Sequence, residues 1–284
     1  MLTPQHRMRC SRALSLLLGL WLTSARLEAQ IFSLSEQQEI ELGREASKKV
    51  ESDMPMLGDG DITGYVNRLG QKLVRNSHRS NLRYSFNVVN SPEINAFALP
   101  GGFIYVNRGL LEAADNESEV AGVLGHEISH VVARHSADQM KKAGIANLIL
   151  GGLGAALGGR GGAVAGITKV GAELGTNAAF MKFSRDDERQ ADELGARNVY
   201  DAGYNPEGMV TFFEKLEHIR KSEPSKLETF FSTHPSPSER VANVSHEIRA
   251  FPRKGDLKTD DPDFHTVKSR LSRLPKPPTP RRPR

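Results

Sequence analysis

Two histidines and a glutamate near the middle of the chain have the spacing of a metal site. The motif HEISH occupies residues 126–130 and places His126 and His130 four residues apart. On a helix both imidazoles then project from one face and can share a Zn²⁺ ion. Glu127 can take a proton from a water whose pKa the zinc lowers, and that water can attack a peptide carbonyl. The motif therefore predicts one catalytic Zn²⁺ per chain and peptidase chemistry.

The residues on either side of this motif favour a buried helix. They are uncharged, as a helix that crosses a hydrophobic core requires, and comprise Val123, Leu124, Ile128, Val131 and Val132. The alternative is a coincidental HExxH motif on a surface helix, which this apolar context makes less attractive.

A catalytic zinc needs a third protein ligand, and it has to come from another segment. The extended motif HExxHxxGxxH is absent, because positions 133 and 136 are Ala133 and Ser136. Glu188 and Asp192 are again four residues apart within a polar stretch that reads as a helix. One carboxylate can bind zinc while the other accepts a hydrogen bond from a ligand imidazole, and we favour Glu188 as the ligand. The alternative is that this stretch is only a solvated helix face.

Four motifs together resemble a known family. NAFALPGG (95–102), HEISH (126–130), SRDDERQADELG (184–195) and THPSPSER (233–240) occur in that order. The set is similar to the zinc metallopeptidase family M48, which contains the CAAX prenyl proteases, bacterial HtpX and the periplasmic BepA-like and LoiP-like proteases. The resemblance covers about residues 35–250 and is closest in layout to the stand-alone periplasmic members. It implies a gluzincin fold, α+β and predominantly helical, with a small sheet bordering the active-site cleft.

The resemblance also implies roles for individual residues. His126 and His130 match the family's zinc histidines, and Glu127 matches its catalytic base. Glu188 matches the third ligand, and Asp192 matches the acidic residue one turn later, which would hold a ligand imidazole from outside the metal's own shell.

The segment Asn95, Ala96, Phe97 and Ala98 matches the family's strand beside the cleft. An edge strand can pair with an extended peptide through backbone hydrogen bonds and so hold the scissile bond over the metal. The alternative is an ordinary interior strand of a hairpin.

His234 and Arg240 match the family's His-Pro…Arg motif and follow a loop-like stretch. His234 could occupy the open zinc position in a resting enzyme, as a latch, or donate to the oxyanion in a working one. Arg240 could stabilise the oxyanion or simply anchor the loop. A surface histidine without such a role is the alternative for His234.

The wider pattern of the chain is helices, a few strands and then helices, which predicts α+β rather than repeated βαβ units. Helices are expected at 35–51, 62–73, 116–135, 184–200, 206–221 and within 235–251, and strands at 83–89, 95–99 and 103–106.

The ends of the chain account for its basic character. The formal charge is +4 and the pI is about 9.2. Residues 1–29 read as a signal peptide cleaved after position 25 or 29, with a mitochondrial transit peptide as the alternative. Residues 253–284 read as a basic, proline-rich disordered tail. The folded body, 30–252, then carries a small negative charge, which argues against nucleic acid as a partner.

Between the two metal motifs, residues 144–175 are rich in glycine. They are expected to form a hairpin or flap, with peripheral membrane contact, here or through the basic tail, as an alternative. The chain contains one cysteine, Cys10, so a disulfide framework and a cysteine-rich zinc finger are both excluded.

These features predict an exported zinc metalloendopeptidase, most simply in a bacterial periplasm. The resemblance implies unfolded or misassembled cell-envelope proteins as substrates, which is a quality-control function. Two other classes stay open: a chaperone or holdase with latent protease activity, and a membrane-anchored stress protease.

Overall fold

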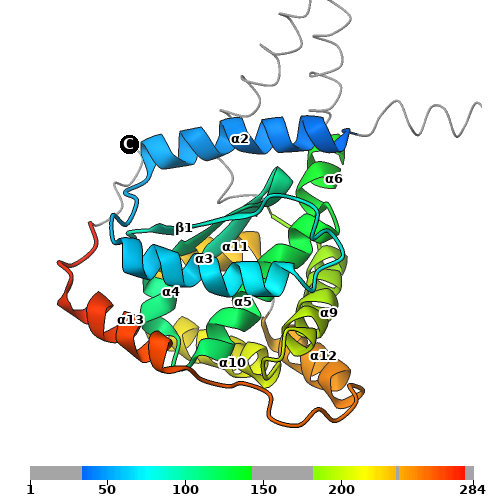
Figure 1. Cartoon of the computed structure of the whole chain (residues 1–284), viewed down its shortest axis with the longest axis vertical. Helices are drawn as coiled ribbons and strands as arrows, with labels where there is room; N and C mark the ends of the chain where they lie inside the picture. Colours follow the sequence, from blue (N-terminus) through cyan, green and yellow to red (C-terminus); the bar gives the residue numbers. More distant parts are fainter. Residues whose placement is uncertain (1–33, 143–181, 235–236, 279–284) are drawn as a thin grey trace, which may run out of the picture.

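The computed structural model of the chain describes residues 34–142, 182–234 and 237–278 (Figure 1). In these residues the elements run in the order α2 (Glu36–Asp53), α3 (Gly60–Val74), β1 (Ser85–Val89), β2 (Ala96–Leu99), the 3₁₀ turn η1 (Pro100–Gly102), β3 (Phe103–Asn107), α4 (Arg108–Ala113), α5 (Glu117–Val132), α6 (His135–Lys142), α9 (Arg185–Asp201), α10 (Glu207–Ser222), η3 (Pro224–Lys226), α11 (Glu228–Thr233), α12 (Pro237–Arg249) and α13 (Pro262–Arg273). The predicted α+β class, mostly helical with a small sheet, is confirmed.

The sheet has three strands in the order β1-β3-β2. β1 is parallel to β3, and β2 is antiparallel to β3 because the two are joined by the tight turn η1. Gly101 and Gly102 carry φ angles of 76° and 97° in that turn, a region that residues with a side chain rarely adopt. The strands thus form a hairpin with β1 added to its far side, which leaves β2 at one edge of the sheet.

Helices cover both faces of the sheet. Successive side chains of a strand point to opposite faces, so each face presents apolar residues to the helices that pack on it. On one face Phe97, Leu99 and Tyr105 pack with α2 residues in one hydrophobic cluster. On the other face Ala96, Ala98, Ile104 and Val106 join the main core with residues of α3 and α5. In Figure 1 α2 lies along one side of the sheet, while α3 and α5 lie on the other.

Helix α5 is the centre of the helical layer. It contacts β2, α3, α9 and α10, and α12 packs on α9 and α10. All of its residues except the last, Val132, are buried, which fits the predicted helix through the core.

The helix that the sequence predicts from 116 to 135 is interrupted. α5 ends at Val132, and a new helix, α6, begins at His135. Between them Arg134 has a φ of 61°, which interrupts the helix.

The prediction of a disordered tail from 253 onward is wrong for much of that stretch. Residues 262–273 form α13, which packs on α3 and α4 and buries Phe264, Val267 and Leu271. The side chain of Asp261 caps its first turn, and Pro262 suits the first helical position. The prolines that suggested disorder begin only at Pro275, after the helix has ended, so the folded body extends well beyond 252.

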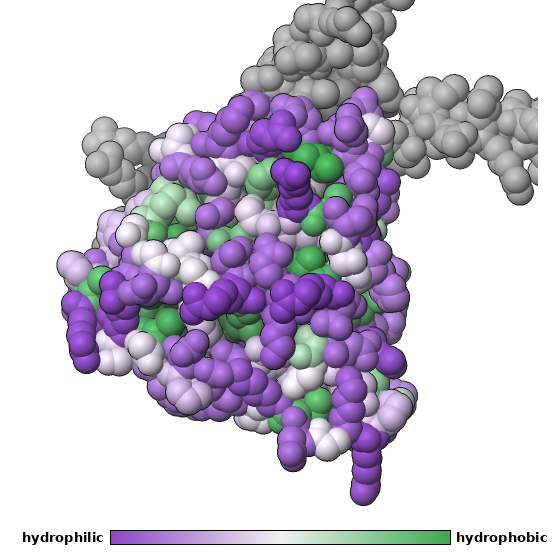
Figure 2. Space-filling model, viewed as in Figure 1, coloured by the Kyte–Doolittle hydropathy of each residue, from purple (hydrophilic) through white to green (hydrophobic). Residues whose placement is uncertain are grey.

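Several predictions concern residues outside the described part of the chain. These are the signal peptide at 1–29, the glycine-rich segment at 144–175 and the last six residues of the basic tail. Among the helices that are described, none has the length and apolar content to cross a membrane. On the face drawn in Figure 2 polar residues predominate, and hydrophobic residues appear in small, separated patches.

Candidate metal centre and active site

Helix α5 supplies three of the predicted functional side chains. The side chain of Asn116 accepts a hydrogen bond from the backbone N–H of Glu119 and so caps the start of the helix. His126, Glu127 and His130 lie two to four turns further along, and all three are buried. The buried context that the sequence predicted for this motif is therefore observed.

Helix α9 supplies the predicted carboxylates. A capping box between Ser184 and Asp187 fixes its first turn. Glu188 and Asp192 follow on the face toward α5, and both are buried, so this helix is not merely a solvated face.

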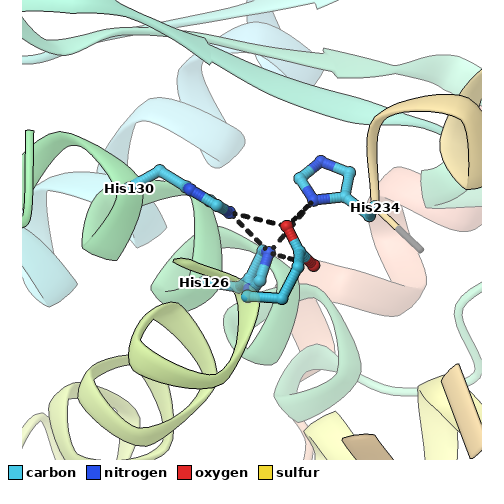
Figure 3. Close-up of side chains that lie close together, drawn as sticks. His126, His130 and His234 are labelled. Atoms are coloured by element: carbon cyan, nitrogen blue, oxygen red, sulfur yellow. Dashed lines mark hydrogen bonds and ion pairs between the residues drawn. The ribbon is translucent and has the colours of Figure 1, made fainter. Parts of the chain in front are cut away.

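Four side chains from three segments converge on one point (Figure 3). The ligand atoms of His126, His130, Glu188 and His234 all lie within 4.8 Å of one another. The Nε2 atoms of the two α5 histidines are 2.9 Å apart. Zinc–nitrogen bonds of about 2.0–2.1 Å place two ligand nitrogens on a tetrahedral zinc roughly 3.3 Å apart. The cluster therefore has the composition and size that a zinc ion requires.

Glu188 lies between the histidines. Its Oε1 is 3.4 Å from Nε2 of His130 and 2.9 Å from Nδ1 of His234, and its Oε2 is 3.7 Å from Nε2 of His126. Burial alone would raise the pKa of Glu188, but the charges of His234 and Arg240 outweigh burial and hold that pKa well below its usual range. The carboxylate is therefore ionised, as a metal ligand has to be.

His130 is in the complementary state. Burial lowers the pKa of His130 well below its usual range, and the neighbouring His126 adds to this effect. The ring is neutral and keeps a lone pair for a metal.

The carboxylate of Glu127 stands apart from this network of pairs. It is buried, and neither of its oxygens has a hydrogen-bond partner among the described residues. Nε2 of His234 lies 3.5 Å from Oε1 of Glu127. A buried carboxylate without hydrogen bonds is costly, which suggests that a water or substrate group pairs with it in use.

Asp192 and Arg240 form a buried pair beside His126. Nε and Nη2 of Arg240 donate to the two oxygens of Asp192 at 2.8 and 2.7 Å, and Nη1 lies 3.0 Å from Oε2 of Glu188. Oδ1 of Asp192 is 2.9 Å from Nδ1 of His126. Burial would raise the pKa of Asp192, but Arg240 outweighs it and lowers that pKa. Asp192 thus accepts from the ring nitrogen of His126 that points away from the cluster.

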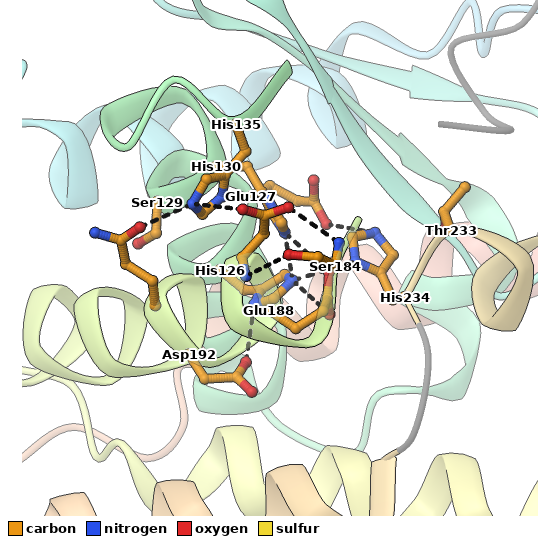
Figure 4. A network of polar contacts seen from close by, with 12 residues as sticks. His126, Glu127, Ser129, His130, His135, Ser184, Glu188, Asp192, Thr233 and His234 are labelled. Atoms are coloured by element: carbon orange, nitrogen blue, oxygen red, sulfur yellow. Dashed lines mark hydrogen bonds and ion pairs between the residues drawn. The ribbon is translucent and has the colours of Figure 1, made fainter. Parts of the chain in front are cut away.

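His234 reaches the cluster from the C-terminal end of α11 (Figure 4). Its Nδ1 is 3.3 Å from Nε2 of His126, and the side chain is buried, so it is not a surface histidine. Burial would lower the pKa of His234, but Glu188 and Glu127 outweigh this and raise it. The preceding carbonyl, of Thr233, accepts a hydrogen bond from the backbone N–H of Phe183, which ties this segment to the start of α9.

The predicted substrate strand is the edge strand β2. Ala96, Phe97 and Ala98 belong to it, and Asn95 immediately precedes it. β2 pairs with β3 on one side, and in the described part of the chain no strand pairs with its other side. Helix α5, which contains the metal motif, packs against β2.

Sequence reasoning missed two side chains that contact the metal cluster. Phe183 stacks on the ring of His130, with ring centroids 3.9 Å apart, and His135 lies against the edge of the same ring. A signal for His135 was available, because a third histidine five residues after His130 in a mostly apolar stretch is unusual. The helix expected over 116–135 does not bring His135 to His130, because positions five apart on a continuous helix do not face each other.

Comparisons with known proteins agree with this geometry. The sequence profile of Peptidase family M48 matches residues 62–248. The beta-barrel assembly-enhancing protease of Escherichia coli (strain K12) is 33% identical over 244 residues, which are 84% of this chain and 49% of that protein. The mitochondrial metalloendopeptidase OMA1 of Schizosaccharomyces pombe is 31% identical over 182 residues, which are 64% of this chain and 52% of that protein. The chain thus spans about half the length of these relatives.

The matched region contains every candidate site residue from Asn95 to Arg240. It confirms the predicted family and the zincin-like fold, and the buried His/Glu cluster is a place where a metal ion could bind. The roles of the individual residues remain predictions. By its sequence profile and by its relatives, this chain belongs to peptidase family M48.

Proposed function

We propose that this protein is an exported zinc-dependent endopeptidase that hydrolyses peptide bonds of unfolded or misassembled cell-envelope proteins. One observation carries the proposal: His126, His130 and Glu188 converge in a buried cluster, beside which the carboxylate of Glu127 has no hydrogen-bond partner among the described residues.

His126, His130 and Glu188 would hold the zinc, which lowers the pKa of a water and polarises the scissile carbonyl. Glu127 then acts as the general base: it takes a proton from the attacking water and later returns it to the leaving amine. Its lack of hydrogen bonds to the residues that the structure describes supports this role, because a base already paired with a donor would lose that pairing before it accepted a proton.

Asp192 and Arg240 would fix the orientation of the ligand His126. Asp192 accepts from Nδ1 of His126 and so directs its Nε2 toward the metal, while Arg240 fixes Asp192 and neutralises its charge. Arg240 also lies over the ring of Phe213, 4.1 Å from its centroid. These contacts favour an anchoring role for Arg240 over a role in stabilising the oxyanion.

The edge strand β2 would bind the substrate. An extended peptide that pairs with Asn95, Ala96, Phe97 and Ala98 adds a strand to the sheet, which requires an unfolded stretch of the substrate. This requirement supports unfolded or misassembled proteins as the substrate class.

The name of the Escherichia coli relative, beta-barrel assembly-enhancing protease, supports cell-envelope proteins as substrates and a periplasmic location. The expected signal peptide at 1–29 points the same way.

The substitution Glu127→Gln tests the proposal directly. It keeps the size of the side chain and removes the base, so we expect casein cleavage to fall by roughly 100-fold or more. Zinc content, measured by metal analysis, should be unchanged. Glu193→Gln, an exposed position on α9, is the matched control and should cleave like the wild type.

Two outcomes would contradict the proposal. Equal inactivity of the wild type and Glu127→Gln toward casein and other unfolded substrates would favour a holdase. Full activity of Glu127→Gln would show that another group is the base.

A further inference from the structure

His135 is a buried titratable side chain that the proposed chemistry does not use. It is the first residue of α6, and only 3% of it is exposed. Its Nδ1 is 2.9 Å from Nδ1 of His130, the ring nitrogen on the side away from the metal cluster. Its Nε2 is 3.0 Å from Oε1 of Gln190 on α9. The ring thus bridges a proposed zinc ligand and the second metal-binding helix (Figure 4).

The partners of His135 determine which of its nitrogens carries the proton. Two acceptors face Nε2, namely Oε1 of Gln190 at 3.0 Å and Oδ1 of Asp187 at 3.9 Å. Because a carbonyl oxygen can only accept, Nε2 donates to Gln190, and Nδ1 keeps a lone pair in the tautomer that this hydrogen bond selects. That lone pair accepts the Nδ1–H of His130, which leaves Nε2 of His130 unprotonated and directed into the cluster. The chain Gln190, His135, His130 thus selects the one tautomer of His130 that binds a metal.

The backbone between the two histidines makes this contact possible. On a continuous helix a residue five positions after His130 would point well away from it. The left-handed conformation of Arg134 interrupts the helix, and His135 after it contacts His130. Arg134 is held there by an ion pair with Glu39, at 2.9 Å, and by a hydrogen bond to the carbonyl of Leu34. Such a conformation is unfavourable for a residue with a side chain and persists where the surroundings enforce it.

The ring of His130 is also fixed on its face. Phe183 stacks on it with an interplanar angle of 26°, so the ring cannot turn about its bond to Cβ without breaking that contact. His130 is thereby held by an edge contact and a face contact, neither of which comes from its own helix.

We propose that His135, oriented by Gln190, is a positioning residue that fixes the tautomer and the ring orientation of the zinc ligand His130. This inference rests on the proposed zinc site. It gives the two histidines different supports, a carboxylate for His126 through Asp192 and an imidazole for His130 through His135.

Zinc binding by variants of the full chain tests the inference. His135→Leu removes the acceptor for His130, and we expect its zinc dissociation constant, measured by competition with a chromogenic chelator, to rise about 10-fold or more. In His135→Asn the side-chain oxygen takes the place of Nδ1 and still accepts, so zinc affinity should return most of the way to that of the wild type. His218→Leu, at an exposed position on α10, is the control and should bind zinc like the wild type.

Unchanged zinc affinity in His135→Leu would overturn the inference, as would equal losses in His135→Leu and His135→Asn. A second measurement uses the wild type and so does not depend on the folding of a variant. It observes the ring nitrogens of the zinc-loaded protein by ¹H–¹⁵N NMR. Protonated Nδ1 on His130 together with protonated Nε2 on His135 is expected, and protonated Nδ1 on His135 would refute the inference.

His130→Ala separates this inference from the proposed site. Wild-type zinc content in His130→Ala would refute the ligand assignment itself. Loss of zinc in His130→Ala, combined with unchanged affinity in His135→Leu, would refute only the positioning role.

Discussion

At the scale of single residues, the side chains of the cluster differ in how many of their polar atoms have a hydrogen-bond partner. Asp192 is paired with Arg240 and His126, and Glu188 lies among His126, His130 and His234. Glu127 has no hydrogen bond in the described structure, although it is equally buried. A metal ligand works best when hydrogen bonds hold it in place. A general base, in contrast, has to be free to take up and release a proton. Both oxygens of Glu127 lack a hydrogen bond among the described residues, whereas only one oxygen of Glu188 does, and this difference fits the base role that we propose for Glu127.

His234 occupies a fourth position in the cluster, and we predict that it is a latch. A catalytic zinc needs one position open for water or substrate, so a histidine bound there would hold the enzyme inactive. We expect His234→Ala to raise the rate of casein cleavage several-fold with unchanged zinc content. His246→Ala, exposed on α12, is the control. Loss of activity in His234→Ala would instead assign His234 to the oxyanion.

At the scale of elements, the site depends on the close packing of α5 against α9. The two helices meet where each has a glycine. A Cβ at Gly195 would lie 3.0 Å from the backbone nitrogen of His126, and one at Gly125 would lie 3.1 Å from the carbonyl oxygen of Gly195. This backbone contact determines how far the carboxylates of α9 lie from the histidines of α5.

A side chain at position 195 should therefore push α9 away from α5. We expect Gly195→Val to weaken zinc binding about 10-fold and to lower the free energy of unfolding by about 1–3 kcal/mol, because overpacking forces backbone shifts. Chelator competition and urea denaturation measure the two effects. The control is Gly64→Ala, within α3, where the nearest atom is the flexible end of Arg68. Wild-type zinc affinity in Gly195→Val would show that the helix spacing is not critical.

At the scale of the whole molecule, the C-terminal helix α13 packs on the folded body. Arg108, on α4, donates to the backbone carbonyls of Leu271 and Pro275, and Lys268 donates to those of Glu112 and Ala114. These bonds join α13 to the element that precedes the metal-binding helix. At least one basic residue of this segment, Lys268, thus forms hydrogen bonds within the protein.

The packing of α13 predicts a cost for truncating its buried face. Leu271 is 1% exposed, and we expect Leu271→Ala to lower the free energy of unfolding by about 3 kcal/mol, through lost burial and the cavity that remains. Urea denaturation measures the change. Ser272→Ala, the exposed neighbour, should stay within about 0.5 kcal/mol of the wild type. Equal stability of the two variants would mean that α13 does not dock in solution.

The sequence by itself determined the local parts of the site. Residues four apart on a helix share a face whatever surrounds them, so the spacing of His126 and His130, and of Glu188 and Asp192, was readable without a structure. The same holds for the cap at Asn116, which marks where α5 begins. Each of these features depends on interactions within a few residues.

Contacts between residues far apart in the sequence depend on the tertiary structure. His234 and Arg240 reach His126 across 108 and 114 residues, His234 from the end of α11 and Arg240 from α12, which packs on α9. His135 turns back to His130 because Glu39, far away in the chain, holds the strained residue Arg134. α13 forms because a helix with few apolar residues gains most of its stability from the surface on which it packs. That surface is assembled from segments distant in the sequence, so local helix propensity does not predict it.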